Sequence, residues 1–191
     1  MRRQSKTVTV RGVAIGGGSR VTVQSMTNTD TADRDATLAQ IRALERCGCD
    51  IVRFTVNSAA AVANIPYFLE HTPLPLVADI HFDYKLAIDA AEAGISKIRI
   101  NPGNIGDDDR VRAVARTCAR LGVPVRVGVN GGSLERQIAA KYGAPTAEAL
   151  AESALENIRR LERFGFDELV VSVKSSDVKL MIEANRLIAA A

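Results

Sequence analysis

The sequence contains no tryptophan, and only 4% of its residues are aromatic. So few aromatic rings leave little surface on which the bases of a single-stranded nucleic acid could stack. Charges nearly balance as well, with 25 Lys and Arg against 22 Asp and Glu and a formal net charge of +3 on 191 residues. A basic surface for nucleic acid is therefore not indicated. We expect no nucleic-acid partner, and any bound anion must be met by a local cluster of cations.

Long apolar runs are also missing, since no stretch of about 18 apolar residues occurs, and we expect no membrane span. The three cysteines, Cys47, Cys49 and Cys118, lack the paired C-x-x-C spacing of a zinc or redox site. Free thiols in odd number are typical of a reducing compartment, which predicts a cytoplasmic protein. The 47% hydrophobic content suffices for a core without disulfides or a metal, and excludes disordered and small disulfide-rich classes.

Short runs rich in Val and Ile alternate with longer segments whose apolar residues recur three and four apart. The runs predict strands at 21–26, 51–56, 76–80, 97–100, 124–129 and 168–174, each followed by a helix. Four polar residues stand where helices should begin, namely Asp30, Asp107, Ser133 and Asp177. Repeated strand–helix units predict a parallel sheet.

The first twenty residues follow a different pattern. Residues 7–10 and 13–15 flank Arg11 and Gly12, which predicts a β-hairpin. We therefore divide the chain into a tail and hairpin at 1–20 and a series of six strand–helix units at 21–191. The hairpin is expected to cover the end of the sheet at which the strands begin.

Two architectures fit six such units: a doubly wound sheet and part of a (β/α)8 TIM-type barrel, which usually has about 250 residues. Four cations inside the predicted strands decide between them. Parallel strands are covered on both faces and should be apolar, and an unpaired buried cation costs several kcal/mol. In a barrel all four cations could converge on one cavity at the carboxyl ends of the strands. The pattern favours an incomplete barrel, although each cation alone could sit at a strand end and reach water. The four are Arg53, Arg99, Arg126 and Lys174.

Other polar residues follow the predicted strands. Asp79 and His81 end the third predicted strand, and the alternation of side chains places them on one face. They could form a hydrogen-bonding or proton-transfer pair in the cavity, or they could be structural. A metal site would need more imidazole than two histidines supply, so we expect none. The loops at 101–106 and 130–133 run into helix starts, where backbone amides can approach a phosphate. The mouth of the first strand should be lined by Gln24, Met26 and Asn28.

Seven motifs occur in one order along the chain: VQSMTNT at 23–29, DIVR at 50–53, PLVADIHFDY at 75–84, RINPGNIG at 99–106, GVNGGSLE at 128–135, KYGAPT at 141–146 and VSVKSSDV at 171–178. Through these motifs the sequence resembles the 4-hydroxy-3-methylbut-2-en-1-yl diphosphate synthase family, from about Thr7 to the end.

The resemblance implies a reductase of the non-mevalonate isoprenoid pathway that opens 2-C-methyl-D-erythritol 2,4-cyclodiphosphate with loss of water. Electrons would come from flavodoxin or ferredoxin through a 4Fe-4S cluster on a separate domain of a homodimer. The four strand cations would clamp the diphosphate, with polar contacts from three amides. Asp79 and His81, the catalytic candidates, would orient the erythritol part. The three amides are Asn101, Asn130 and Gln24.

The sequence also departs from that family. The CP-x-C and C-x-x-NGPGE motifs that hold the cluster do not occur, and neither do the seventh and eighth barrel strands. The three cysteines do not match those ligands, and we expect all three to be packed in the fold. The chain is thus expected to be an N-terminal piece, inactive alone. Two alternatives stay open: a non-redox phosphate-binding module, and a barrel related to pterin-linked synthases.

Overall fold

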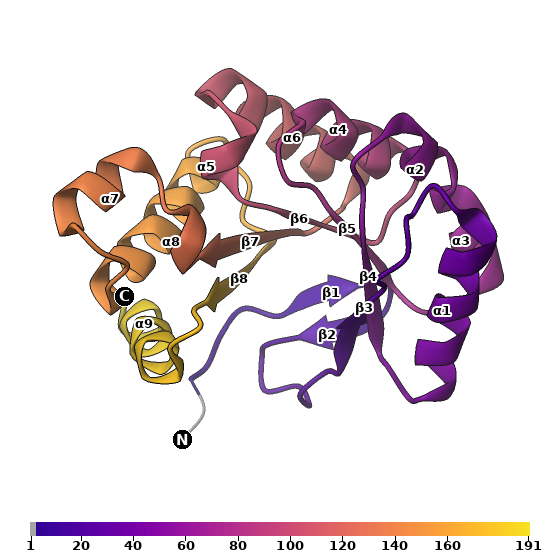
Figure 1. Cartoon of the computed structure of the whole chain (residues 1–191), viewed down its shortest axis with the longest axis horizontal. Helices are drawn as coiled ribbons and strands as arrows, with labels where there is room; N and C mark the ends of the chain where they lie inside the picture. The colour runs from indigo at the N-terminus through magenta and orange to yellow at the C-terminus, as the bar shows by residue number, and fades with distance from the viewer. Residues whose placement is uncertain (1–2) are drawn as a thin grey trace.

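A computed structural model of the chain describes residues 3–191. It contains an antiparallel hairpin, β1 and β2, and a six-stranded parallel sheet in the order β3-β4-β5-β6-β7-β8. The sheet curls, and the helices lie along its convex side (Figure 1). The strands are β1 (Val8–Val10), β2 (Val13–Ile15), β3 (Gln24–Met26), β4 (Ile51–Thr55), β5 (Leu76–Asp79), β6 (Lys97–Ile100), β7 (Val125–Asn130) and β8 (Leu169–Lys174).

This order follows the chain without reversal, as in a barrel, whereas a doubly wound sheet reverses at a switch point. Within residues 3–191, β3 and β8 form the two edges and do not pair with each other. The predicted incomplete TIM-type barrel is confirmed as a curled sheet of six strands. The expected N-terminal tail begins with residues 1–2, which lie outside the described residues.

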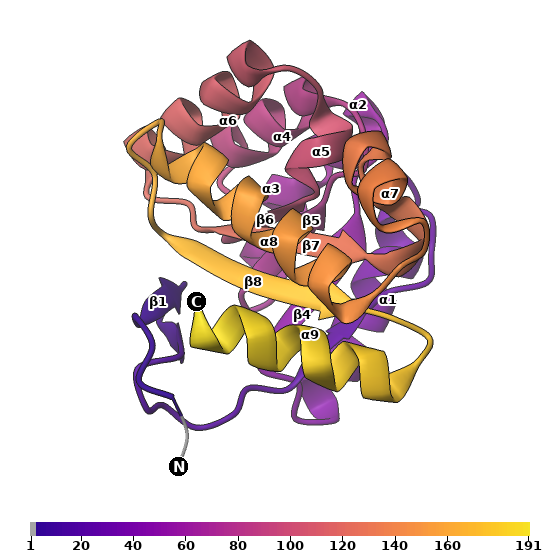
Figure 2. The same ribbon diagram turned by 90° about the vertical axis from the view of Figure 1, so that its left-hand side faces the viewer.

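Helices connect the strands on the outside of the curl, and the view in Figure 2 shows α8 and α9 beside β8. No helix within residues 3–191 is long and apolar enough to cross a membrane. The helices are α1 (Arg34–Arg46), α2 (Ala59–Ala63), α3 (Ile65–His71), α4 (Tyr84–Glu92), α5 (Pro102–Ile105), α6 (Asp108–Leu121), α7 (Arg136–Tyr142), α8 (Ala147–Glu162) and α9 (Val178–Ala190). A 3₁₀ turn at Gly131–Ser133 follows β7.

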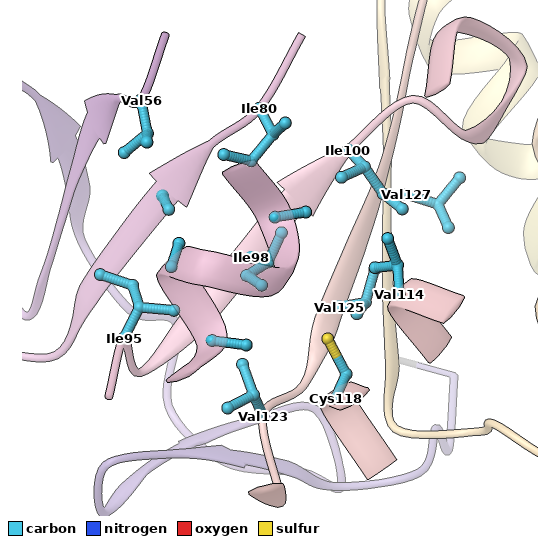
Figure 3. Close-up of a cluster of buried hydrophobic side chains, with 14 of the residues drawn as sticks. Val56, Ile80, Ile95, Ile98, Ile100, Val114, Cys118, Val123, Val125 and Val127 are labelled. Atoms are coloured by element: carbon cyan, nitrogen blue, oxygen red, sulfur yellow. The ribbon is translucent and has the colours of Figure 1, made fainter. Parts of the chain in front are cut away.

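The apolar core lies between the convex face of the sheet and these helices (Figure 3). Ile98 and Ile100 of β6 and Val125 and Val127 of β7 are fully buried there, and Cys118 of α6 packs among them. Because side chains alternate along a strand, the residues between these apolar ones point to the concave interior. The register pairs Asp79 with Arg99 and Arg99 with Arg126, so charged side chains share that interior.

The hairpin covers the amino-terminal end of the sheet, as expected. The guanidinium of Arg11 donates hydrogen bonds to the backbone oxygens of Leu69, Thr72 and Leu74, which precede β5. Val8 and Val10 of β1 are buried. The hairpin is thus tied to the segment that leads into β5.

Three local expectations are wrong. The first strand spans only Gln24–Met26 instead of 21–26, and Val21 and Val23 are 73% and 58% exposed, because this edge strand pairs with β4 alone. Helix α1 is capped by Asp33 instead of Asp30. Ser133 lies in the 3₁₀ turn and caps no α-helix. Asp107 and Asp177 cap α6 and α9 as predicted.

Candidate anion-binding site

Asp79 is the centre of the charged cluster inside the sheet. Its side chain is 4% exposed, and its Oδ1 accepts a hydrogen bond from Nη1 of Arg99 at 3.0 Å. Its Oδ2 lies 3.6 Å from Nε of Arg53 and 3.8 Å from Nε2 of His81. One carboxylate thus orients cations from two neighbouring strands and meets the histidine predicted to share its face.

Arg99 is held from its other side by β7. Its Nη2 donates to the backbone oxygen of Gly128 at 3.0 Å. A Cβ at position 128 would overlap the guanidinium, because the side chain of Arg99 lies directly over that backbone. Arg99 can occupy this position in the interior because glycine at 128 has no Cβ.

Arg126 projects into the same interior but has no carboxylate partner within residues 3–191. Its Nε donates to Oγ of Ser172 at 2.9 Å. Burial lowers the pKa of Arg126, as do the guanidiniums of Arg53 and Arg99, while Asp79 opposes them. An arginine stays protonated in proteins despite such a shift, so the cluster holds more positive charge than Asp79 neutralises. That imbalance is the electrostatic condition for anion binding.

Met26 and Gln24 of β3 face this interior, whereas Asn28 does not. The thioether of Met26 lies 3.2 Å from Nε of Arg53. Asn28 instead hydrogen-bonds with Gln40 of α1 through both its backbone amide and its side chain. The expectation that all three residues line one mouth is therefore wrong for Asn28.

Lys97 is an interior cation that the sequence argument missed. It opens β6 two residues before Arg99 on the same face and is 1% exposed, with Nζ 3.4 Å from Oε1 of Gln24. Gln24, predicted to contact the substrate, is therefore the partner of this buried amine. A lysine in the short run 97–100, two residues before Arg99, was the available signal.

The remaining predicted residues lie toward the rim. His81 is exposed, and Lys174 is exposed at the end of β8, where the register pairs it with Asn130. Asn101, in contrast, is buried, and its side chain accepts from the amide of Gly103 at 3.1 Å and so caps α5. The structure thus gathers Arg53 and Arg99 at Asp79, with Arg126 on the same inner face, and leaves Lys174 exposed at the end of β8.

Two further residues fix the loops at this rim and were also missed. Glu135 accepts hydrogen bonds at 2.7 Å from Ser153 and from Asn157, both buried on α8. Arg160 of α8 donates to the backbone oxygens of Pro102 at 3.0 Å and Gly106 at 2.8 Å. Helix α8 therefore holds the loops after both β6 and β7.

The three cysteines do not fit an iron–sulfur cluster. Cys49 is buried, with Sγ 3.1 Å from the backbone oxygen of Ile51, and Cys118 is fully buried. Burial raises the pKa of the Cys118 thiol to about 12, which disfavours the thiolate that binds a metal. No group of three or more potential metal ligands occurs within residues 3–191. Cys47 is exposed, so the expectation that all three thiols are packed is wrong for this one.

A family model described as the GcpE TIM-barrel domain matches residues 5–191. The chain belongs to this family. It is 52% identical over 190 residues to the 4-hydroxy-3-methylbut-2-en-1-yl diphosphate synthase (flavodoxin) of Haemophilus ducreyi, covering 100% of this chain and 52% of that protein. It is 50% identical over 188 residues to the Fusobacterium nucleatum protein of the same name, covering 98% of this chain and 53% of the relative. This GcpE chain thus spans about half the length of the curated relatives it matches.

Solved structures of another barrel family share the fold. Dihydropteroate synthase of Xanthomonas albilineans matches with a TM-score of 0.64 at 17% identity, over 98% of this chain and 72% of that one. The enzyme from Stenotrophomonas maltophilia matches with a TM-score of 0.65 at 18% identity, over 89% and 66%. At such identities the likeness concerns the barrel alone, and the GcpE assignment rests on the sequence.

Proposed function

We propose that this GcpE chain is the substrate-binding barrel of a 4-hydroxy-3-methylbut-2-en-1-yl diphosphate synthase, with 2-C-methyl-D-erythritol 2,4-cyclodiphosphate as its ligand. The observation that carries the proposal is the cluster of three arginines on the inner face of the sheet, where Arg53 and Arg99 share the carboxylate of Asp79 and Arg126 has no carboxylate partner within residues 3–191. Guanidinium groups bind phosphate oxygens through paired hydrogen bonds. A diphosphate carries the negative charge that this cluster lacks.

Each charged residue has a distinct task in this proposal. Arg126, which has no carboxylate partner within residues 3–191, would make the strongest phosphate contact. Asp79 keeps Arg99 and Arg53 oriented while the site is empty. Lys174 and Asn130 would close over the phosphates from the rim, with Asn101 beside them. His81, 3.8 Å from Asp79, would hydrogen-bond the erythritol part.

No described residue has a part in electron transfer under this proposal. Two relatives carry flavodoxin in their names, so we propose flavodoxin, with ferredoxin as the other candidate, as the donor of the whole protein. The 4Fe-4S cluster implied by the resemblance would be held by residues outside this chain, because the cysteines here do not fit it. A homodimer and a cytoplasmic location belong to the same proposal.

Calorimetric titration of the chain with the cyclodiphosphate tests the ligand assignment. We expect binding, and Arg126→Ala should weaken it roughly 10- to 100-fold, because a charge-assisted contact to phosphate contributes about 1.5–3 kcal/mol. Arg116→Ala is the matched control, since Arg116 is exposed on α6. An equal effect of both substitutions, or no binding at all, would refute the proposal.

The alternative of a general phosphate-binding module is less favoured, because the matched identity extends over the whole chain to synthases with one name. Inorganic pyrophosphate separates the two functions. The proposed barrel should bind the cyclodiphosphate more tightly than pyrophosphate, and His81→Ala should reduce that preference. Equal affinities would support the general module.

A further inference from the structure

Lys97 is buried deep in the curled sheet without a carboxylate partner within residues 3–191. It is 1% exposed, and its one side-chain hydrogen bond within the described part of the chain joins Nζ to Oε1 of Gln24 at 3.4 Å. A buried ammonium normally requires a paired negative charge. A glutamine oxygen is different, because it carries no full charge and accepts a hydrogen bond from an amine as well as from an ammonium. The contact therefore permits either charge state of Lys97.

The groups around Lys97 are mostly positive. Arg53 faces it from β4 and Arg126 from β7, while Arg99 lies two residues along its own strand. Asp79 of β5 is the one carboxylate on the inner face of the described strands β3 to β8, and it is bound to Arg99 and near Arg53. Lys174 of β8 adds a further cation at the exposed end of this face, and His81 lies 3.8 Å from Asp79. The side chains of β3 carry no charge.

The charge of Lys97 must therefore respond to what occupies the cluster. Burial lowers the pKa of Lys97 to about 8, and the fields of Arg126 and Arg53 act in the same direction. A diphosphate bound to those two arginines would neutralise their fields and place negative charge above the amine. Both changes favour the ammonium.

We propose that Lys97 takes up a proton when a diphosphate binds the arginine cluster, so that the anion is bound together with a proton. This inference rests on the proposed anion site and adds to it a residue whose protonation changes when the site is occupied. Two consequences follow. Diphosphate affinity falls as the pH rises above 8, and Gln24 allows the change because it stabilises neither form exclusively.

Titration calorimetry with inorganic pyrophosphate at pH 8.5, in buffers of different ionisation enthalpy, measures the protons taken up on binding. A lysine with a pKa of about 8 is roughly three-quarters neutral at this pH, so it can contribute up to about 0.7 proton. Pyrophosphate has its own protonation change, which cancels when variants are compared. The expected result is that Lys97→Met takes up fewer protons than the unmodified chain, by up to about 0.7 proton per chain.

Two further variants sharpen the test. Gln24→Glu supplies a carboxylate that keeps Lys97 charged in the free chain, so the uptake should be lost as in Lys97→Met. Lys85→Met is the matched control, because Lys85 is exposed on α4, and its uptake should equal that of the unmodified chain. Since Gln24→Glu retains Lys97, the proposal stays testable if Lys97→Met does not fold.

The outcomes separate the inference from the proposed function. Pyrophosphate binding with the same proton uptake in the unmodified chain, Lys97→Met and Gln24→Glu would overturn the role of Lys97 and leave the anion site standing. Absence of pyrophosphate binding, or binding unaffected by Arg126→Ala, would overturn both.

Discussion

Arg99 and Gly128 are packed against each other across two neighbouring strands: the guanidinium lies over the glycine backbone and donates to its oxygen at 3.0 Å. The same guanidinium reaches Asp79 on the opposite side at 3.0 Å. The position of a charged side chain in the candidate site thus depends on the absence of a methyl group on the next strand.

Gly128→Ala should therefore displace Arg99. We expect a loss of about 1–3 kcal/mol in the free energy of unfolding, typical of overpacking in a dense interior, and weaker pyrophosphate binding. Urea titration measures the first effect and calorimetry the second. Gly132→Ala serves as the stability control, because a Cβ there would meet nothing within 4 Å. A Gly128→Ala chain with unchanged stability would contradict the close packing of Arg99 against Gly128.

Lys97→Met should stabilise the empty chain, because it replaces a buried amine that has no carboxylate partner in the described fold. The pKa of Lys97 falls from 10.5 to about 8, so between these values the unfolded chain binds more protons and stability rises with pH. The penalty is complete below pH 8 and disappears toward pH 10.5. We expect Lys97→Met to gain about 1–3 kcal/mol at pH 7 and much less at pH 10.

Urea unfolding at the two pH values measures this gain, and Lys85→Met should change stability by less than about 0.5 kcal/mol at either. A gain that is the same at pH 7 and pH 10 would show that packing, and not the charge of Lys97, sets the difference.

Arg160→Ala should loosen the loop after β6. Arg160 holds the backbone oxygens of Pro102 and Gly106 and pairs with Asp108 at 2.6 Å, so its loss frees both ends of α5. Amide hydrogen exchange at 103–106 should accelerate by about tenfold or more, since hydrogen bonds to a charged group contribute about 1.5–3 kcal/mol. Arg159→Ala, at an exposed position of α8, should leave these amides unchanged. Equal amide exchange at 103–106 in the two variants would show that Arg160 does not hold this loop.

Thiol labelling should distinguish the three cysteines. Cys47 is exposed, whereas Cys49 and Cys118 are buried and the pKa of Cys118 is raised to about 12. At pH 8 we expect one thiol of the native chain to react rapidly with a disulfide reagent and all three to react in urea. Cys47→Ser should abolish the rapid phase. Rapid modification of Cys118 without denaturant would contradict its burial.

Much of this arrangement could be predicted from the sequence. Alternating apolar and polar residues in β4, β6 and β7 indicated which side chains face the helices, and placed Arg53, Arg99 and Arg126 on the opposite face. The spacing of Asp79 and His81 predicted their common face, and their 3.8 Å separation agrees with it. Such periodicities depend on local backbone geometry, which a sequence carries directly.

Other features depended on contacts between distant segments. The burial of Lys97 could not be predicted from its own strand, because the residues that enclose it come from β3, β4 and β7. Glu135 and Arg160 were missed for the same reason, since their partners lie on other elements. The first strand was overestimated because apolar composition does not reveal that an edge strand has one neighbour.

The sequence by itself determined the order of strands and helices, the sidedness of each strand and membership of the GcpE family, because period, caps and motifs are local properties. Only the tertiary structure decided which charges meet. The curl of the sheet brings one carboxylate to two arginines, leaves Arg126 paired with a serine and buries Lys97 against a glutamine. Electrostatic energies depend on distance and burial, and both are set by the folded chain as a whole.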